Sequence, residues 1–274
     1  MKIILIGLFF LAFQVKAQID YKHVGLFTKH LNETGFATDA TNYLNGLNIN
    51  QYNQTKLDSH NLQLAYAYFY KKDFETSSRL VSELKIQNEN TYLLNGICLL
   101  NAKLYKEGID KLVKCEESNQ LGQLALYGSR VLTSSEIDSL MVVSINYPYH
   151  VKGITQALGM LSSRKSKSPV IAALMSAFIP GSGKIYGGKI GEGVAAFASV
   201  GVLASATLEQ YFKGGLNKNP QLYLIGIPAL IFYGGNIYGS YFSVKVANYE
   251  FNETIHNEVL FNINIPFTKY LSGK

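Results

Sequence analysis

The chain has 274 residues, of which 47% are hydrophobic and only 16% are charged, whereas about 25% charged residues are usual in soluble domains. The formal net charge of +6 is unevenly distributed: residues 18–150 carry 12 basic and 14 acidic side chains, and residues 151–274 carry 11 and 5. A basic C-terminal half with long apolar runs favours contact with anionic lipid headgroups and argues against a nucleic-acid partner.

The N-terminus has the pattern of a secretory signal peptide. A short basic start, Met1-Lys2, precedes an apolar core over residues 3–13, and Val15-Lys16-Ala17 approximates a small-x-small cleavage site. We therefore predict a signal peptide over residues 1–17, cleaved before Gln18; the alternative is an uncleaved anchor. Both place the following residues outside the cytoplasm, so we expect the front half of the chain to be extracytoplasmic.

Residues 18–150 show a helical repeat pattern. Three aromatic residues, Phe36, Phe74 and Tyr105, lie 38 and 31 residues apart, close to the period of about 34 residues of tetratricopeptide repeats. Small and large residues recur at matching offsets around these positions, so that a small side chain on one helix can admit a large one from its neighbour. The segment thus resembles tetratricopeptide repeats, in which stacked helical hairpins share one core.

The clearest repeat unit covers residues 61–84, with a turn at Lys71-Lys72-Asp73 and Asp73 as the cap of its second helix. A second unit covers residues 92–115. A weaker first unit covers residues 21–47. A last pair of helices is expected over residues 121–131 and 134–145.

The groove between stacked hairpins is expected to bind a protein partner, and the tyrosines that could line it are Tyr68, Tyr70, Tyr92 and Tyr105. The alternative is that these side chains pack between helices. Cys98 and Cys115 are expected to be buried thiols, because on antiparallel helices they fall at different heights, out of reach of a disulfide.

The sequence of the back half predicts a membrane module over residues 168–250, after a basic linker over residues 151–167. Residues 190–208 and 222–244 are each apolar over about the 20 residues that a transmembrane helix needs. The polar connection between them has Gly214-Gly215 as its expected turn.

A shorter apolar segment precedes these two spans. Residues 168–178 begin with Ser168 as a helix cap and Pro169 at the first helical position, but they stop too early to cross a bilayer. We predict a re-entrant or interfacial helix, followed by a reversal over the glycine-rich residues 180–188. Two crossings place the C-terminus outside the cytoplasm; if the short helix also crosses, the C-terminus is cytoplasmic.

Small residues are expected to bring the two spans together. Gly235 and Gly239 form a G-x-x-x-G pattern, which in lipid suits a tight hairpin or a homodimer. Gly193, Gly201 and Ser205 have similar spacing on the first span. Asn236 needs a partner at membrane depth, and Ser199, Ser205 or a backbone carbonyl of the first span are the expected ones.

The run Gly181-Ser-Gly-Lys184 looks like the end of a phosphate-binding loop. The full pattern needs a glycine where Phe178 stands and a hydroxyl residue where Ile185 stands. We therefore expect no nucleotide and no other cofactor.

The same segment resembles a family of small bacterial membrane modules built around Ser-x-x-x-Pro-Gly-x-Gly-[Gln/Lys]-x-Tyr-x-Gly, which often follow tetratricopeptide-like repeats in secreted precursors. A second family-like stretch is residues 233–241. The resemblance covers about residues 166–250 and implies a membrane fold but no biochemical activity. The matching residues are Ser176, Pro180, Gly181, Gly183, Lys184, Tyr186 and Gly188.

The tail, residues 251–274, alternates apolar and polar residues after Leu260, as a strand does; a disordered tail is the alternative. No motif predicts an enzyme, and the five histidines have no metal-ligand spacing. The sequence predicts an all-α, non-enzymatic scaffold, anchored in the membrane and binding a protein partner through its repeats. The alternative is a transport or insertion component, with the re-entrant loop Pro180-Gly-Ser-Gly-Lys184 lining a path. Lys184, Glu192 and Asn236 at membrane depth favour this alternative, because a plain anchor would not need them.

Overall fold

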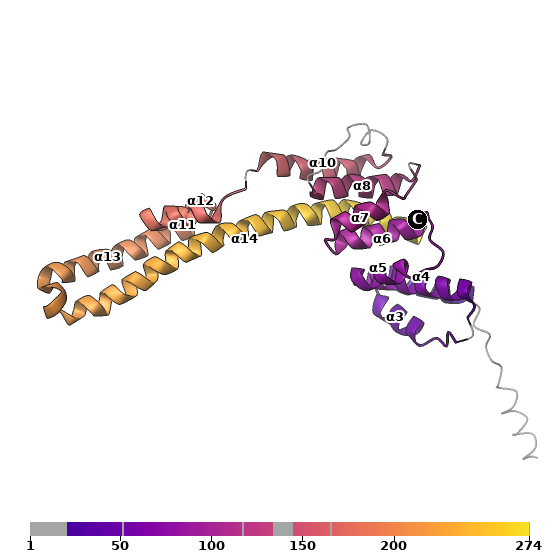
Figure 1. Cartoon of the computed structure of the whole chain (residues 1–274), viewed down its shortest axis with the longest axis horizontal. Coiled ribbons are helices and arrows are strands. Elements are labelled where there is room, and N and C mark those ends of the chain that lie inside the picture. Colours follow the sequence, from indigo (N-terminus) through magenta and orange to yellow (C-terminus); the bar gives the residue numbers. More distant parts are fainter. Residues whose placement is uncertain (1–20, 51, 117, 134–144, 165, 274) are drawn as a thin grey trace, which may run out of the picture. The chain divides into compact units, whose positions relative to one another are not determined.

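The computed structural model describes residues 21–50, 52–116, 118–133, 145–164 and 166–273 (Figure 1). Every regular element in these ranges is a helix, which confirms the all-α prediction. The predicted signal peptide and the second helix of the last predicted pair lie outside the described residues.

The chain divides into two compact units, which are described separately. The helix-pair unit comprises the residues up to Ile154 and those from Leu260 onward, and the apolar unit is Thr155–Val259. The helix-pair unit contains α2 (Tyr21–Glu33), α3 (Ala37–Asn45), α4 (Gln54–Tyr70), α5 (Phe74–Ser82), α6 (Glu89–Asn101), α7 (Tyr105–Leu112), α8 (Gln120–Thr133), the start of α10 (Pro148–Ser163) and the end of α14 (Pro220–Ser272).

Three of the turns in this unit have the same geometry. Gly35, Lys72 and Lys103 each follow a helix with a left-handed backbone, at φ 89°, 66° and 64°. In each turn the next residue donates its N–H to the carbonyl five residues earlier, at 2.8 to 2.9 Å, as in a Schellman motif. The α2–α3, α4–α5 and α6–α7 hairpins therefore repeat one local structure.

The predicted small positions bring the helices of a hairpin together. The Ser77 hydroxyl donates to the Ala65 carbonyl at 2.8 Å, which joins α5 to α4. In α6 and α7, a Cβ added to Gly96 would lie 2.6 Å from Cγ of Leu112, and one added to Gly108 would lie 3.2 Å from the Gly96 carbonyl oxygen. A larger residue at either position would force the neighbouring helix or the Leu112 side chain to shift.

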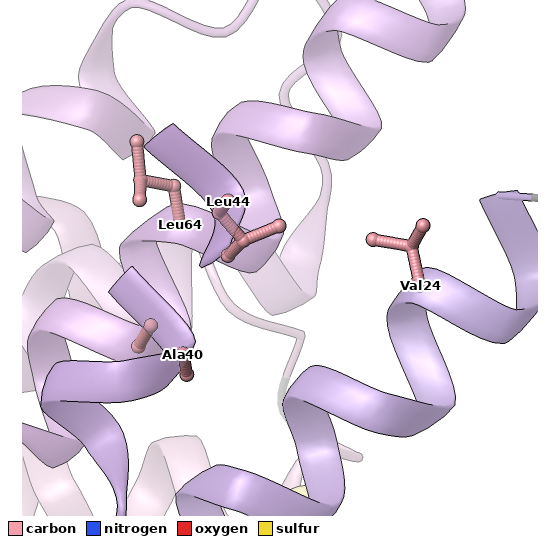
Figure 2. Close-up of a cluster of buried hydrophobic side chains, with 5 residues drawn as sticks. Val24, Ala40, Leu44 and Leu64 are labelled. Carbon is pink, nitrogen blue, oxygen red and sulfur yellow. The ribbon is translucent and has the colours of Figure 1, made fainter. Parts of the chain in front are cut away.

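Apolar side chains from three helices form a buried core cluster, shown in Figure 2. Val24 of α2 faces Ala40 and Leu44 of α3 and Leu64 of α4, and all four are more than nine-tenths buried. Such stacking supplies the core that a single helical hairpin lacks.

Capping of α5 follows the prediction. The Asp73 carboxylate accepts the Thr76 N–H at 3.2 Å. The next unit uses a different residue type for the same purpose, because Asn88 caps α6 in a capping box with Thr91.

The C-terminal segment corrects two expectations. Residues 251–272 are part of α14, neither a strand nor an irregular tail. The last turns of this helix pack in the helix-pair unit, where the Phe267 ring lies 5.1 Å from the Phe69 ring and Asn264 exchanges hydrogen bonds with Asn101 at 2.9 and 3.1 Å. The expected linker is also helical over most of its length, since α10 extends to Ser163.

The apolar unit contains α11 (Pro169–Phe178), α12 (Ser182–Tyr186), α13 (Ile190–Lys218) and most of α14. Among the described residues, two helices are long and apolar enough to cross a membrane, Ile190–Gly214 and Pro220–Ser272, and little of either apolar stretch is buried. The turn between α13 and α14 is not at Gly214-Gly215, which lie inside α13. It is at Asn219, whose amide donates to the Gln210 carbonyl at 3.0 Å.

Candidate functional site

The segment with the family-like motif, residues 176–188, folds into a tight turn between α11 and α12, which is called the corner below. The Ser168 hydroxyl accepts the Ile171 N–H, which confirms the predicted cap, and Pro169 occupies the first turn of α11. Gly181 and Gly188, on either side of α12, have left-handed φ angles of 83° and 95°. The corner therefore reverses the chain twice within a few residues.

A chain of hydrogen bonds links the corner to α14. The Gly183 N–H donates to Ser176 Oγ at 2.9 Å. The oxygens of Ser176 and Ser240 lie 2.7 Å apart, and Ser240 donates its own hydrogen to the Asn236 carbonyl at 2.8 Å. Ser176 must therefore donate to Ser240, and the chain runs in one direction through α12, α11 and α14.

Asn236 fills a gap that Pro180 creates. In a continuing helix the Ser176 carbonyl would accept from residue 180, but a proline has no N–H. The Asn236 amide lies 3.5 Å from this carbonyl, and its Oδ1 accepts the Gly181 N–H at 3.1 Å. Three residues earlier on α14, the Tyr233 hydroxyl donates to the Ala177 carbonyl. Because the last carbonyl groups of a helix have no partner within the helix, these two side chains cap the end of α11.

The prediction that Asn236 bonds to the first span was therefore wrong. Its contacts are with the corner, whereas the two serines proposed on the first span, Ser199 and Ser205, donate to carbonyls of their own helix. A sequence places a polar side chain on a helix face, but it does not show which neighbouring segment folds against that face.

Glycines of the corner are required by close backbone contacts. A Cβ added to Gly183 would lie 1.9 Å from the Ala172 carbonyl oxygen, and one added to Gly181 would lie 2.0 Å from the Gly193 carbonyl oxygen. Real Cβ atoms essentially never approach a neighbour below 3.0 Å. These glycines hold α11, α12 and α13 together.

The G-x-x-x-G pattern does not pack the two spans together. A Cβ added to Gly235 or to Gly201 would meet no described atom within 4 Å, and one added to Gly239 would meet only the Lys184 side chain. The prediction of a tight contact between the two spans at these glycines is therefore wrong, and the homodimer alternative stays a prediction. Gly193 makes its close contacts with the corner, where an added Cβ would lie 2.4 Å from Cγ1 of Ile185.

Charged groups of the corner lie at one side of a shallow cavity of about 510 Å³ formed by α12, α13 and α14. Glu192 Oε2 lies 4.0 Å from Lys184 Nζ, and Glu192 Oε1 lies 3.5 Å from Lys189 Nζ. Asn236 and Gly235 also line this cavity, and the rest of the wall is mostly apolar. Tyr186 faces the other way, and its hydroxyl accepts the Ser168 N–H at 3.2 Å.

The four tyrosines proposed for a groove are all partly buried. Tyr70 lines a cavity of about 470 Å³ in the helix-pair unit. Tyr68 and Tyr92 lie beneath the ammonium groups of Lys71 and Lys114, 5.6 and 5.2 Å from the ring centres. Tyr105 begins α7.

The thiols are free and buried, as expected. Burial raises the pKa of Cys98 to about 12, although the Ser77 hydroxyl near its sulfur lowers it slightly. Burial and the Glu89 carboxylate raise the pKa of Cys115 to about 11. Within the described residues, no three His, Cys, Asp or Glu side chains are grouped to hold a metal ion.

No protein-family model, curated protein or solved structure matches the chain. Ser240 and Tyr233 fall within the family-like stretch 233–241, but they were not singled out from the sequence as site residues. The signal for Ser240 is its position four residues after Asn236 on the same helix face.

Proposed function

We propose that this chain is a non-enzymatic scaffold, anchored in the inner membrane of a bacterium, whose tetratricopeptide-like helix pairs bind a protein partner in the periplasm. The observation that carries the proposal is the set of hydrogen bonds that the polar side chains of the corner make. Ser176, Ser240, Asn236 and Tyr233 all bond to the chain's own backbone or to each other. The motif then has a structural purpose, which is to fold the anchor.

The helix-pair unit supports the binding half of the proposal. Its three hairpins repeat one turn geometry and stack through small residues, as in repeat proteins that bind other proteins. Large apolar side chains such as Leu26, Ile86 and Val113 are about three-fifths exposed on this unit. Exposed apolar side chains near a repeat surface suit contact with a partner protein, although single ones are common on any surface.

Photo-crosslinking in intact membranes tests the proposal. A benzophenone amino acid is placed in turn at Leu26, Ile86 and Val113, and as a control at Leu224, which is 76% exposed on the apolar part of α14. We expect one protein to crosslink from at least one position on the helix-pair unit and not from Leu224. Crosslinks to lipid alone from all four positions would contradict a scaffold.

A second candidate function is a transport or insertion component. The observation that favours it is the cavity that contains Lys184, Glu192 and Asn236, because an anchor has no need of an ion pair near membrane depth. Purified protein in liposomes distinguishes the two. Ion flux that is lost in Lys184→Ala and Glu192→Gln variants favours transport, whereas the scaffold predicts no flux above that of empty liposomes.

A further inference from the structure

The helix-pair unit contains a cavity that none of the predicted motifs explains. Its volume is about 470 Å³, and its walls come from α2, α4, the start of α6 and the last turn of α14. Side chains with amide or phenol groups dominate the lining: Asn32, Gln63, Tyr66, Tyr70, Asn90 and Tyr270. The size is typical of a ligand site.

One amide in the wall lacks a hydrogen bond. Asn32 is only 6% exposed, and its Oδ1 has no partner among the described residues. Burying such an acceptor is unfavourable, and a group of this kind in a folded protein needs an explanation. Rotation about χ2, which is a soft torsion for asparagine, can present either the oxygen or the amino group of Asn32 to the cavity.

A second amide lies close to Asn32 in the wall. The single hydrogen of the Thr28 hydroxyl is donated to the Val24 carbonyl at 2.9 Å, and Gln63 Oε1 lies 3.4 Å from the same hydroxyl. A Cβ added to Gly25 would lie 2.9 Å from Gln63 Nε2, so the absence of a side chain at Gly25 leaves room for this amide. The cavity therefore has a second primary amide in its wall beside that of Asn32.

Three phenols complete the wall. The Tyr270 hydroxyl donates to Asn90 Oδ1 at 2.7 Å, which fixes the end of α14 against α6. The pKa of Tyr66 is raised to about 12, mainly by burial and further by electrostatic interaction with Tyr270 and Tyr70. Burial and the Glu33 carboxylate also raise the pKa of Tyr70. Tyr66 and Tyr70 therefore remain protonated at neutral pH and can act as donors.

The cavity has little net charge. No carboxylate is among the described residues that line it, and its one ammonium group, on Lys29, lies 3.8 Å from the Glu33 carboxylate. A charged ligand would find no unpaired counter-charge here, so the chemistry favours an uncharged ligand that both donates and accepts hydrogen bonds.

We propose that this cavity binds an uncharged, extended segment of a protein partner, with one peptide group paired to the Asn32 amide and a side chain placed among Tyr66, Tyr70 and Tyr270. A peptide group offers one donor and one acceptor, which match the two groups of a primary amide. Tyrosine and asparagine are also the residues that antibody sites use for contact area and adaptable hydrogen bonds. The inference rests on the proposed scaffold function, and it names the site and the ligand chemistry.

The probe is a phage-displayed library of random heptapeptides without Asp, Glu, Lys or Arg, selected on the full chain in detergent micelles. The dissociation constants of synthetic copies of the selected peptides are measured by calorimetry for the wild type and for Asn32→Leu. We expect the variant to bind at least about tenfold more weakly, equivalent to about 1.4 kcal/mol. Its thermal unfolding midpoint should not fall, because leucine has a similar size and removes the unpaired acceptor.

Two further variants make the test specific. Asn42→Leu changes an exposed asparagine on α3 and should leave both affinity and stability unchanged. Tyr270→Phe removes the hydroxyl that bonds Asn90 and should weaken binding even if Asn32→Leu fails to fold.

Several outcomes would overturn the inference. The inference is overturned if the selected peptides bind the Asn32→Leu and Tyr270→Phe variants as tightly as they bind the wild-type chain. Failure to select any peptide, together with Asn32-dependent binding of maltotetraose or chitotetraose, would assign the cavity to a saccharide instead. If the crosslinking experiment still captures a protein in either case, only the site assignment fails and the scaffold function stands.

Discussion

Replacement of Gly183 by alanine should unfold the corner of the apolar unit. The new Cβ would lie 1.9 Å from the Ala172 carbonyl oxygen, so α12 has to move by about 1 Å to bring the contact to 3.0 Å. Forced overpacking costs about 1–3 kcal/mol. The same movement breaks the bond from the Gly183 N–H to Ser176 Oγ, and a buried donor without a partner costs about 1–3 kcal/mol more. We expect a loss of about 3 kcal/mol or more.

The assay is equilibrium unfolding in mixed lipid and dodecyl sulfate micelles. The chain has no tryptophan, so a single tryptophan at Phe178, which is 85% exposed, can report on the corner by fluorescence. All variants carry this reporter. The matched control is Gly201→Ala, because a Cβ there meets nothing within 4 Å.

Gly201→Ala should leave the free energy of unfolding unchanged or raise it by up to about 1 kcal/mol, since alanine is the better helix former. If Gly183→Ala is as stable as Gly201→Ala to within about 0.5 kcal/mol, the close contact between α11 and α12 is not present and the reasoning is refuted.

Three other predictions follow from the same contacts. Ser176→Ala should lower stability more than Ser240→Ala, because only the first leaves a backbone N–H without an acceptor; equal losses in the same micelle assay would contradict the hydrogen bond from the Gly183 N–H to Ser176. Burial lowers the pKa of His60 below 6.5, so folding stability should be constant above pH 6.5 and fall as the pH drops toward the folded pKa; denaturant unfolding of a His60→Gln variant should show a smaller pH dependence. Iodoacetamide should alkylate Cys98 and Cys115 slowly at pH 8 in the folded protein and rapidly after unfolding, since burial keeps both thiols protonated; mass spectrometry that finds rapid labelling without denaturant would refute this.

The helix pairs could be predicted because their signals are local. The Asp73 cap and the small residues Ala65 and Gly96 act between helices joined by a few residues, so their spacing in the sequence fixes their partners. The length and apolar composition of the two spanning helices are likewise properties of continuous segments.

The end of α14 was missed because tertiary contacts decide its structure. The run from Leu260 alternates like a strand, and Pro266 removes one helical hydrogen bond. Nevertheless Ile263 and Phe267, four residues apart, are both almost completely buried on one helix face. Packing against the helix-pair unit outweighs the local preference, and single-sequence patterns do not contain that information.

The corner was predicted only in part for a similar reason. Proline and glycine indicated a reversal at residues 180–188, but not the segments it would contact. Asn236 was recognised as a residue that needs a partner, yet its partner lies 55 residues away in the sequence. The unpaired Asn32 left no signal at all, because an asparagine near a helix end is common and its lack of a partner is visible only in three dimensions.

An anchor exchange tests the scaffold proposal most directly. Residues 166–250 are replaced by an unrelated two-span hairpin that continues into the helical residues 251–272, and the benzophenone group is placed at whichever helix-pair position captured a partner. The scaffold predicts that the exchanged chain captures the same protein in comparable yield. Loss of the partner from a folded, membrane-inserted exchange chain, with retention in a chain that keeps residues 166–250, would contradict it.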